Sequence, residues 1–221
     1  NDASKLDEGQ ALYTVMCRPN GGIIDDLLVY KLGAQRFMLV VNAANRDKDF
    51  EWITQNNSFN ASVKDRSDDT CLLAIQGPEA LSILQELSSV KLDGIKFYHF
   101  TTGDIAGFDD VIISATGYTG EKGFELYFDK EKVDPIKVWE AIMDKGKSRG
   151  IAPAGLGARD TLRLEMGLAL YGNDLTEETN PIEARLGWLT KLDKDKFIGQ
   201  DALKKVKEEG AKRKLFGFEV T

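Results

Sequence analysis

An aspartate pair interrupts an apolar stretch that runs from Ile23 to Tyr30. Its isoleucine, leucine, valine and tyrosine side chains favour a β-strand, in which alternate residues share a face. Asp26 should therefore project on the same side as Leu28 and Tyr30, in an otherwise apolar row. A carboxylate in such a row costs several kcal/mol unless a partner compensates for its burial. The turn just before it also attracts carboxylates, so a structural and a functional role for Asp26 both stay open.

Two later segments place polar side chains in a similar way. A glycine-rich turn at 117–123 contains Tyr118, and its three glycines permit a tight turn with positive φ. In the strand that follows, Glu125 and Tyr127 should share the face opposite the apolar residues. Arg159 lies at the start of a predicted helix. Each has an ordinary structural explanation: a hairpin for the turn, and an ion pair with a neighbouring carboxylate for the arginine.

An amide completes this set of polar groups. Val40 and Asn42 should share one face of the strand that follows the aspartate strand, so they could lie near Asp26. Taken together, the segments indicate a cleft with two carboxylates, aromatic rings, an amide and a guanidinium. Rings stack on a flat heteroaromatic ligand, and a carboxylate accepts paired N–H groups. The pattern alone favours a pterin or purine site.

Composition excludes several other classes of protein. The 221 residues are 42% hydrophobic and 29% charged, which is typical of a globular chain, and the formal net charge of −7 argues against broad nucleic-acid binding. No apolar run reaches the roughly 18–20 residues that span a bilayer. Cys17 and Cys71 form no disulfide framework or zinc pattern, and His99 is the only histidine. We expect an intracellular chain that binds neither metal, membrane nor nucleic acid.

The elements that must position these groups alternate without strict βαβ order, which predicts an α+β fold of antiparallel or mixed sheets with packed helices. Three strands joined by short turns open the chain as a meander. The expected strands are 11–17, 23–31, 37–41, 71–76, 96–102, 110–115, 124–128 and 215–221. The expected helices are 45–55, 78–88, 133–147, 154–166, one that starts at Asn180-Pro181, and 200–209.

Six groups of motifs follow one another along nearly the whole chain. They are GGIIDDL at 21–27, VVNAAN at 40–45, AIQGP at 74–78, GYTGE at 117–121 with GFE at 123–125, PAGLGARD at 153–160 with RLE at 163–165, and LYGND at 170–174 with NP at 180–181. In these motifs and in their order, the chain resembles the T-protein family of the glycine cleavage system, the tetrahydrofolate-dependent aminomethyltransferases. The resemblance implies a three-domain parent, of which this chain is a central fragment that lacks an N-terminal stretch and the C-terminal barrel domain. The implied division is 1–60 for part of the first folate-binding domain, 61–150 for a second α+β domain, and 151–221 for a return to the first domain and the start of the last.

The resemblance also implies a reaction and a site. The family takes the aminomethyl group from the lipoyl arm of the H-protein, releases ammonia and passes the one-carbon unit to tetrahydrofolate. Asp26 falls on the family's catalytic aspartate, and Glu125 would hold the pterin amino edge. The remaining folate-lining positions fall on or close to Leu28, Tyr30, Val40, Asn42, Tyr118, Tyr127 and Arg159. The expected location is the cytoplasm, or the mitochondrial matrix in a eukaryote.

Two departures from the family pattern and two rival functions accompany this resemblance. Arg185 and Met166 stand where relatives usually have a small residue. One rival is a folate-dependent demethylase of a methylated sulfur or amine compound. The other is a non-catalytic folate-binding relative; such relatives carry a cysteine-containing motif, whereas the corresponding stretch here, 196–200, has no cysteine.

Overall fold

The computed structural model describes residues 1–219, which fold into two compact units. Unit 1 contains residues 1–63 together with the described part of the segment from Ala169 onward, and unit 2 contains Lys64–Leu168. The chain passes from unit 1 to unit 2 between residues 63 and 64, and returns to unit 1 between residues 168 and 169. The divisions implied by the family resemblance fell after residues 60 and 150. The fold is α+β, with antiparallel sheets and packed helices.

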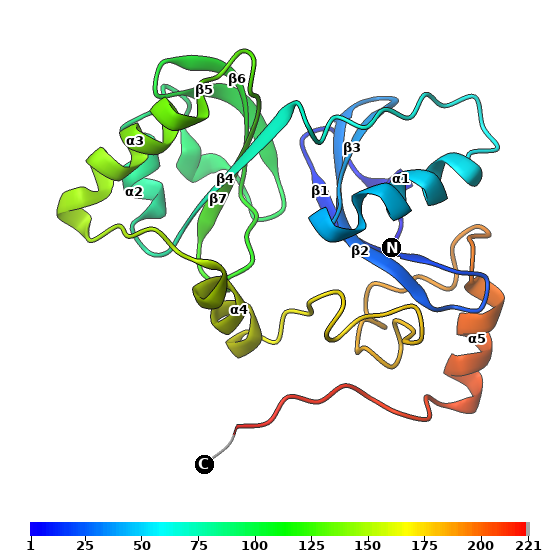
Figure 1. Cartoon of the computed structure of the whole chain (residues 1–221). Helices are drawn as coiled ribbons and strands as arrows, with labels where there is room; N and C mark the ends of the chain where they lie inside the picture. The colour runs from blue at the N-terminus through cyan, green and yellow to red at the C-terminus, as the bar shows by residue number, and fades with distance from the viewer. Residues whose placement is uncertain (220–221) are drawn as a thin grey trace. The chain divides into compact units, whose positions relative to one another are not determined.

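The sheet of unit 1 is a three-stranded antiparallel meander, as the short turns predict. Its strands are β1 (Ala11–Cys17), β2 (Ile23–Gly33) and β3 (Arg36–Val40), and β2 lies in the centre (Figure 1). In this register Leu28 pairs with Tyr13 on one side and with Val40 on the other. The central strand therefore carries the aspartate pair between two neighbours that can supply partners.

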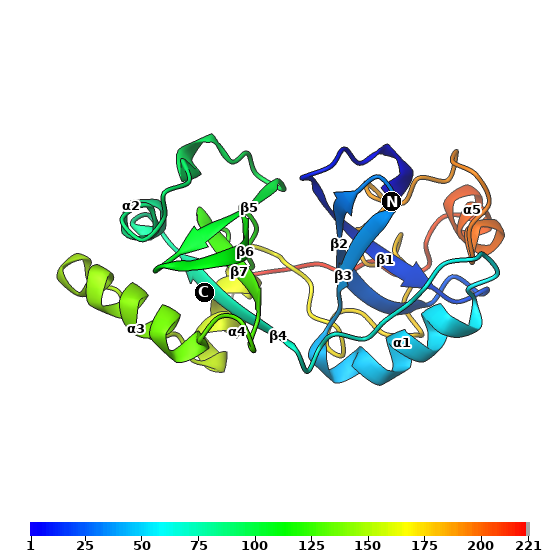
Figure 2. The ribbon, with the colours of Figure 1, turned by 90° about the horizontal axis from the view of Figure 1, so that it is seen from above.

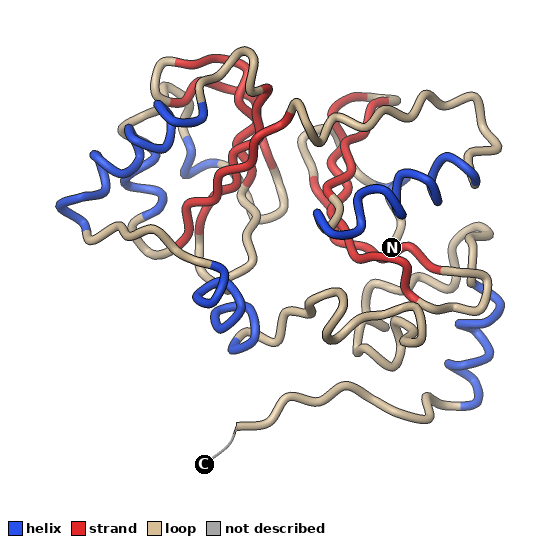
Figure 3. Tube along the Cα trace, viewed as in Figure 1, coloured by secondary structure: helices blue, strands red, loops and turns tan. Residues whose placement is uncertain are grey.

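Helices and a long irregular segment complete unit 1. The helical elements are η1 (Ala3–Lys5), η2 (Ala43–Asn45), α1 (Arg46–Gln55) and α5 (Gln200–Glu209). Residues 169–199 form turns rather than helices or strands (Figure 3). They nevertheless supply Leu175, Leu186 and Leu189 to a core around Ile23. Local sequence does not organise this segment; burial against β2 does.

The helix expected from Asn180 does not form. The Asn180 side chain accepts bonds from the backbone N–H groups of Ile182 and Glu183, each at 3.0 Å, as a helix cap would. Arg185, however, adopts φ 60°, a left-handed conformation that ends the turn and ordinarily favours glycine. Its guanidinium lies 5.2 Å from the ring centroid of Phe216.

Unit 2 is a four-stranded antiparallel sheet covered by helices. The strands are β4 (Thr70–Gln76), β5 (Phe100–Ile105), β6 (Phe108–Ser114) and β7 (Gly123–Asp129), in the order β4-β7-β6-β5. Helices α2 (Ala80–Gln85) and α3 (Pro135–Gly146) cover one face of this sheet (Figures 1 and 2). The remaining elements are η3 (Leu92–Gly94), η4 (Lys147–Arg149) and α4 (Leu156–Glu165).

The core of unit 2 follows from strand alternation. Phe124, Leu126 and Phe128 are buried together in the main apolar cluster, as the period of two predicts. The strand expected at 96–102 begins only at Phe100, because Tyr98 has φ 59° and residues 96–99 form a turn.

The expected C-terminal strand is absent at 215–219, and residues 220–221 lie outside the described part of the chain. Among residues 1–219, every helix is too short or too polar to cross a membrane.

Candidate functional site

Asp26 lies half-buried in the central strand of unit 1, fixed by side chains from both neighbouring segments. The Tyr13 hydroxyl donates to Asp26 Oδ2 at 2.8 Å, and the Asn42 amide Nδ2 donates to Asp26 Oδ1 at 2.8 Å. Burial raises the pKa of Asp26 above its usual value, and the nearby charge of Asp25 raises it further. The bonds from Tyr13 and Asn42 oppose that shift because they stabilise the charged form. The result is an oriented carboxylate with donors on both oxygens.

Asn42 bridges the two aspartates of β2. Its Nδ2 lies 2.8 Å from Asp26 Oδ1 and 2.9 Å from Asp25 Oδ1, and its backbone N donates to Asp25 Oδ2 at 3.0 Å. Only the NH₂ end of an amide can serve two carboxylate acceptors, so the orientation of this side chain is determined by its partners. The predicted approach of Asn42 to Asp26 is observed. Leu28 pairs with Val40 at the end of β3, and Asn42 lies two residues beyond Val40.

The structure adds three residues to unit 1 that the sequence analysis did not place in the site. Asp25 is completely buried, and Asn45 Nδ2 donates to its Oδ1 at 2.6 Å. Strand alternation assigned Asp25 to the face opposite Asp26, yet both carboxylates reach Asn42. Tyr13 could have been found from the alternation of β1 once its register with β2 was known. Asn45 had a weaker signal, since it lies three residues beyond Asn42 in the VVNAAN motif.

The other predicted residues of unit 1 differ in accessibility. Leu28 and Val40 are paired and half-buried, whereas Tyr30 is completely buried opposite Met38. A cavity of about 280 Å³ in this unit is lined mainly by β1 and by segments from Leu189 to Leu203. None of the predicted site residues lines it.

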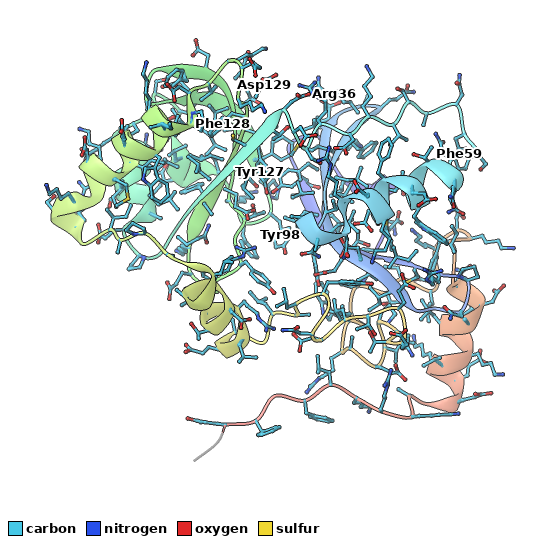
Figure 4. The ribbon with its side chains drawn as sticks, in the orientation of Figure 1. Arg36, Phe59, Tyr98, Tyr127, Phe128 and Asp129 are labelled. Atoms are coloured by element: carbon cyan, nitrogen blue, oxygen red, sulfur yellow. The ribbon has the colours of Figure 1, made fainter. Side chains whose placement is uncertain are left out.

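Unit 2 contains a second buried carboxylate. Glu125, in β7, is 7% exposed, and its Oε2 accepts bonds from the hydroxyls of Thr116 and, at 3.0 Å, Tyr127. Ser114, which pairs with Glu125 across β6 and β7, has its hydroxyl 2.9 Å from that of Thr116. Tyr127, which lies within β7, is labelled in Figure 4. Glu125 and Tyr127 share a face, as predicted, and hydroxyl donors compensate for the burial of the carboxylate.

Tyr118 and Arg159 also lie together in unit 2. The Arg159 guanidinium lies 4.7 Å from the centroid of the Tyr118 ring, a cation–π contact that leaves the arginine exposed. The structural explanation of Arg159 was an ion pair with Asp160 or Glu165, and of these Asp160 pairs with Arg163 at 2.7 Å. Gln76 supports the turn, because its Nε2 donates to the backbone oxygen of Thr116 at 3.1 Å.

The predicted residues thus form two sets. Unit 1 contains the first set, which is Asp26, Leu28, Tyr30, Val40 and Asn42. Unit 2 contains the second set, which is Tyr118, Glu125, Tyr127 and Arg159. Within residues 1–219, no group of three histidine, cysteine or carboxylate side chains has an arrangement that could hold a metal ion. Each set contains an oriented carboxylate that can accept N–H groups or stabilise a nearby cation.

The structure thus defines an α+β protein of two units, each with an oriented carboxylate. The chain belongs to the family described as the GCVT N-terminal domain, whose model matches residues 1–194. This chain is 54% identical over 220 residues to an aminomethyltransferase of Halothermothrix orenii. The alignment covers 100% of this chain and 61% of that protein. The chain is also 51% identical to an aminomethyltransferase of Flavobacterium psychrophilum, and that alignment covers 100% of this chain and 60% of the relative. The chain therefore spans about three fifths of the length of these curated relatives.

A solved structure agrees with this assignment. The glycine cleavage system aminomethyltransferase T of Bartonella henselae superimposes with a TM-score of 0.84 at 34% sequence identity. The match covers 95% of this chain and 56% of that one. The α+β fold described above is therefore the fold of the corresponding part of that protein.

Proposed function

We propose that this chain is the folate-handling part of a glycine cleavage system aminomethyltransferase. The protein would take the aminomethyl group carried on the lipoyl arm of the H-protein, release ammonia, and transfer the one-carbon unit to tetrahydrofolate to give 5,10-methylenetetrahydrofolate. The observation that carries this proposal is the 54% identity, along the whole chain, to a protein named aminomethyltransferase. Tetrahydrofolate is a substrate here, and no metal is required.

Asp26 would supply the electrostatic part of catalysis. Cleavage of the carbon–nitrogen bond and formation of an iminium both develop positive charge near the reacting nitrogens. A carboxylate held by Tyr13 and Asn42 is already oriented, so it stabilises that charge without reorganisation during the reaction. Its raised pKa also suits it to relay a proton. Half-burial strengthens both effects because less water screens the charge.

The residues of unit 2 would bind the folate ring. Glu125 is oriented by Thr116 and Tyr127, and a carboxylate accepts the paired N–H groups of a pterin amino edge. Tyr118 and Arg159 present a flat ring and a guanidinium, which suit stacking and an anionic group. In unit 1, the half-buried side chains of Leu28 and Val40 would supply apolar surface beside Asp26. The partners would be tetrahydrofolate and the lipoylated H-protein, with a cytoplasmic location.

Glu125→Gln should weaken tetrahydrofolate binding by about 10- to 100-fold in the full-length protein, because the neutral amide replaces one acceptor by a donor and loses charge assistance. Isothermal titration calorimetry of wild type and variant with tetrahydrofolate measures this change. Glu121→Gln is the matched control, since Glu121 is exposed in the preceding turn. Equal affinity for wild type and Glu125→Gln would remove Glu125 from the folate site.

The reaction itself is tested by offering alternative donors to the full-length protein with tetrahydrofolate. Aminomethyl-loaded H-protein should give ammonia and 5,10-methylenetetrahydrofolate, measured by coupled absorbance assays. Methylated sulfur and amine compounds should give neither product. Turnover of those compounds in place of the H-protein would replace this proposal with a demethylase, and folate binding without any turnover would indicate a non-catalytic relative.

A further inference from the structure

Asp49 is a buried carboxyl group that receives no ordinary hydrogen bond. It lies in α1 of unit 1, is 1% exposed, and neither of its oxygens is reached by an N–H or hydroxyl donor among the described residues. The carboxyl group of Asp25 acts on it and raises its pKa. Two carboxylates in contact repel each other, so a bond between them requires a proton on one of the two.

The surroundings of the pair decide which residue holds that proton. Asp25 accepts three N–H bonds, from Asn42 N, Asn42 Nδ2 and Asn45 Nδ2, and these stabilise its charged form. Asp49 has no such donors. The pKa of Asp49 is raised to about 8. Burial is the largest cause, and interaction with the Asp25 carboxyl group, including its charge, is the next. The proton therefore belongs to Asp49, which has no donor to stabilise a negative charge.

Other charged groups near Asp49 do not neutralise it. Asp26, from β2, raises the pKa of Asp49 further, whereas the positive charge of Lys48, from α1, lowers it. The Lys48 ammonium is directed elsewhere: Nζ lies 2.6 Å from the backbone oxygen of Ile24 and 2.8 Å from the Tyr171 hydroxyl. The net environment keeps the proton on Asp49 at neutral pH.

We propose that Asp49 is a positioning residue, held as a neutral carboxylic acid that donates its proton to Asp25. Asp25 in turn fixes Asn42, and Asn42 fixes Asp26, so four side chains from α1, β2 and the segment after β3 form one hydrogen-bonded series. The kinetic part of this inference rests on the proposed function, in which Asp26 acts on the substrate. The protonation of Asp49 does not rest on it.

The pair has a consequence for stability. The unfolded chain releases the Asp49 proton near pH 3.8, whereas the folded chain keeps it up to about pH 8. Since the folded state binds more protons in this interval, the contribution of Asp49 to stability falls as pH rises from about 4 through about 8. Asp49→Asn removes this titration while keeping an N–H donor toward Asp25. The Tm of the variant minus that of wild type should therefore increase with pH across this range, whereas exposed Asp47→Asn should show no such trend.

The protonation state is measured directly by ¹³C NMR of aspartate-labelled full-length protein. We expect one aspartate carboxyl that titrates near pH 8, is absent in Asp49→Asn and persists in Asp47→Asn. If every aspartate carboxyl titrates below about pH 6, close to the ordinary range, the proposed proton does not exist. Because this readout uses the wild-type protein, it holds even when a variant folds poorly.

Kinetics separate positioning from mere structural support. Asp49→Leu lacks a donor for Asp25 and should lower kcat by more than about tenfold with KM for tetrahydrofolate within about twofold, because small displacements of reacting groups are costly. Asp49→Asn should restore most of that loss at pH 7. Equal kcat for wild type and Asp49→Leu would overturn the positioning role. Absence of aminomethyl transfer by wild type would instead contradict the proposed function, and the NMR titration would still decide the state of Asp49.

Discussion

Asp26→Asn in the full-length protein should lower kcat for aminomethyl transfer by about 10²- to 10⁴-fold, the range expected when a charge-stabilising or proton-transferring group is lost. The asparagine has nearly the same shape, and its Oδ1 can still accept one bond from Tyr13 or Asn42. Folding should therefore persist, and KM for tetrahydrofolate should change little. Single-turnover formation of 5,10-methylenetetrahydrofolate from aminomethyl-loaded H-protein measures the chemical step apart from product release.

The control for this substitution is another aspartate of unit 1. Asp47→Asn removes an exposed carboxylate from α1 and should leave kcat at the wild-type value. Circular dichroism and Tm establish that Asp26→Asn is folded. A folded Asp26→Asn protein with near-normal turnover would show that the negative charge at this position takes no part in catalysis.

Gly22→Ala should destabilise unit 1 by about 3 kcal/mol or more, at the upper end of overpacking effects. A Cβ at Gly22 would lie 1.9 Å from the backbone oxygen of Glu177, and backbone atoms there have little freedom to move. Both segments of this contact are fixed in place. Ile23 N donates to the backbone oxygen of Thr179 at 3.0 Å, and Arg18 pairs with Glu177 at 2.6 Å. The urea midpoint of unfolding measures the loss.

Gly33→Ala is the matched control for Gly22→Ala. Gly33 also lies at an end of β2, but a Cβ there meets only the Arg36 Cβ at 3.8 Å, an ordinary contact. The free energy of unfolding of the Gly33→Ala variant should stay within about 1 kcal/mol of the wild-type value. Equal urea midpoints for the two variants would mean that the segment around Glu177 does not pack against the turn before β2 as described.

Local patterns predicted most elements because each depends on neighbours along the chain. The three strands of the meander and the helix at 200–209 were found within a few residues of their observed ends. The helix predicted from Asn180 was wrong, although its cap geometry was present. A cap stabilises only the first turn, and the left-handed backbone at Arg185 outweighs it.

The candidate site was predictable in part for a related reason. Strand alternation placed Asp26 beside Leu28, and the hairpin brought Asn42 within hydrogen-bonding distance. Alternation along a strand cannot describe a helix, so the burial of Asp49 in α1 without a hydrogen-bond donor was not foreseen. The role given to Asp26 came from the family resemblance, and it stays a prediction until turnover is measured.

The sequence by itself determined most of the element types, the α+β class, the family and the position of one carboxylate in an apolar strand. These depend on side-chain propensity and on the period of two, both of which are local. Tertiary structure alone decided that Asp25 is completely buried and that Asp49 has no donor. It also decided that residues 169–199 complete the core around Ile23 without helix or strand of their own. The physical reason is that burial and desolvation depend on groups far apart in the chain, and only the packed fold brings those groups together.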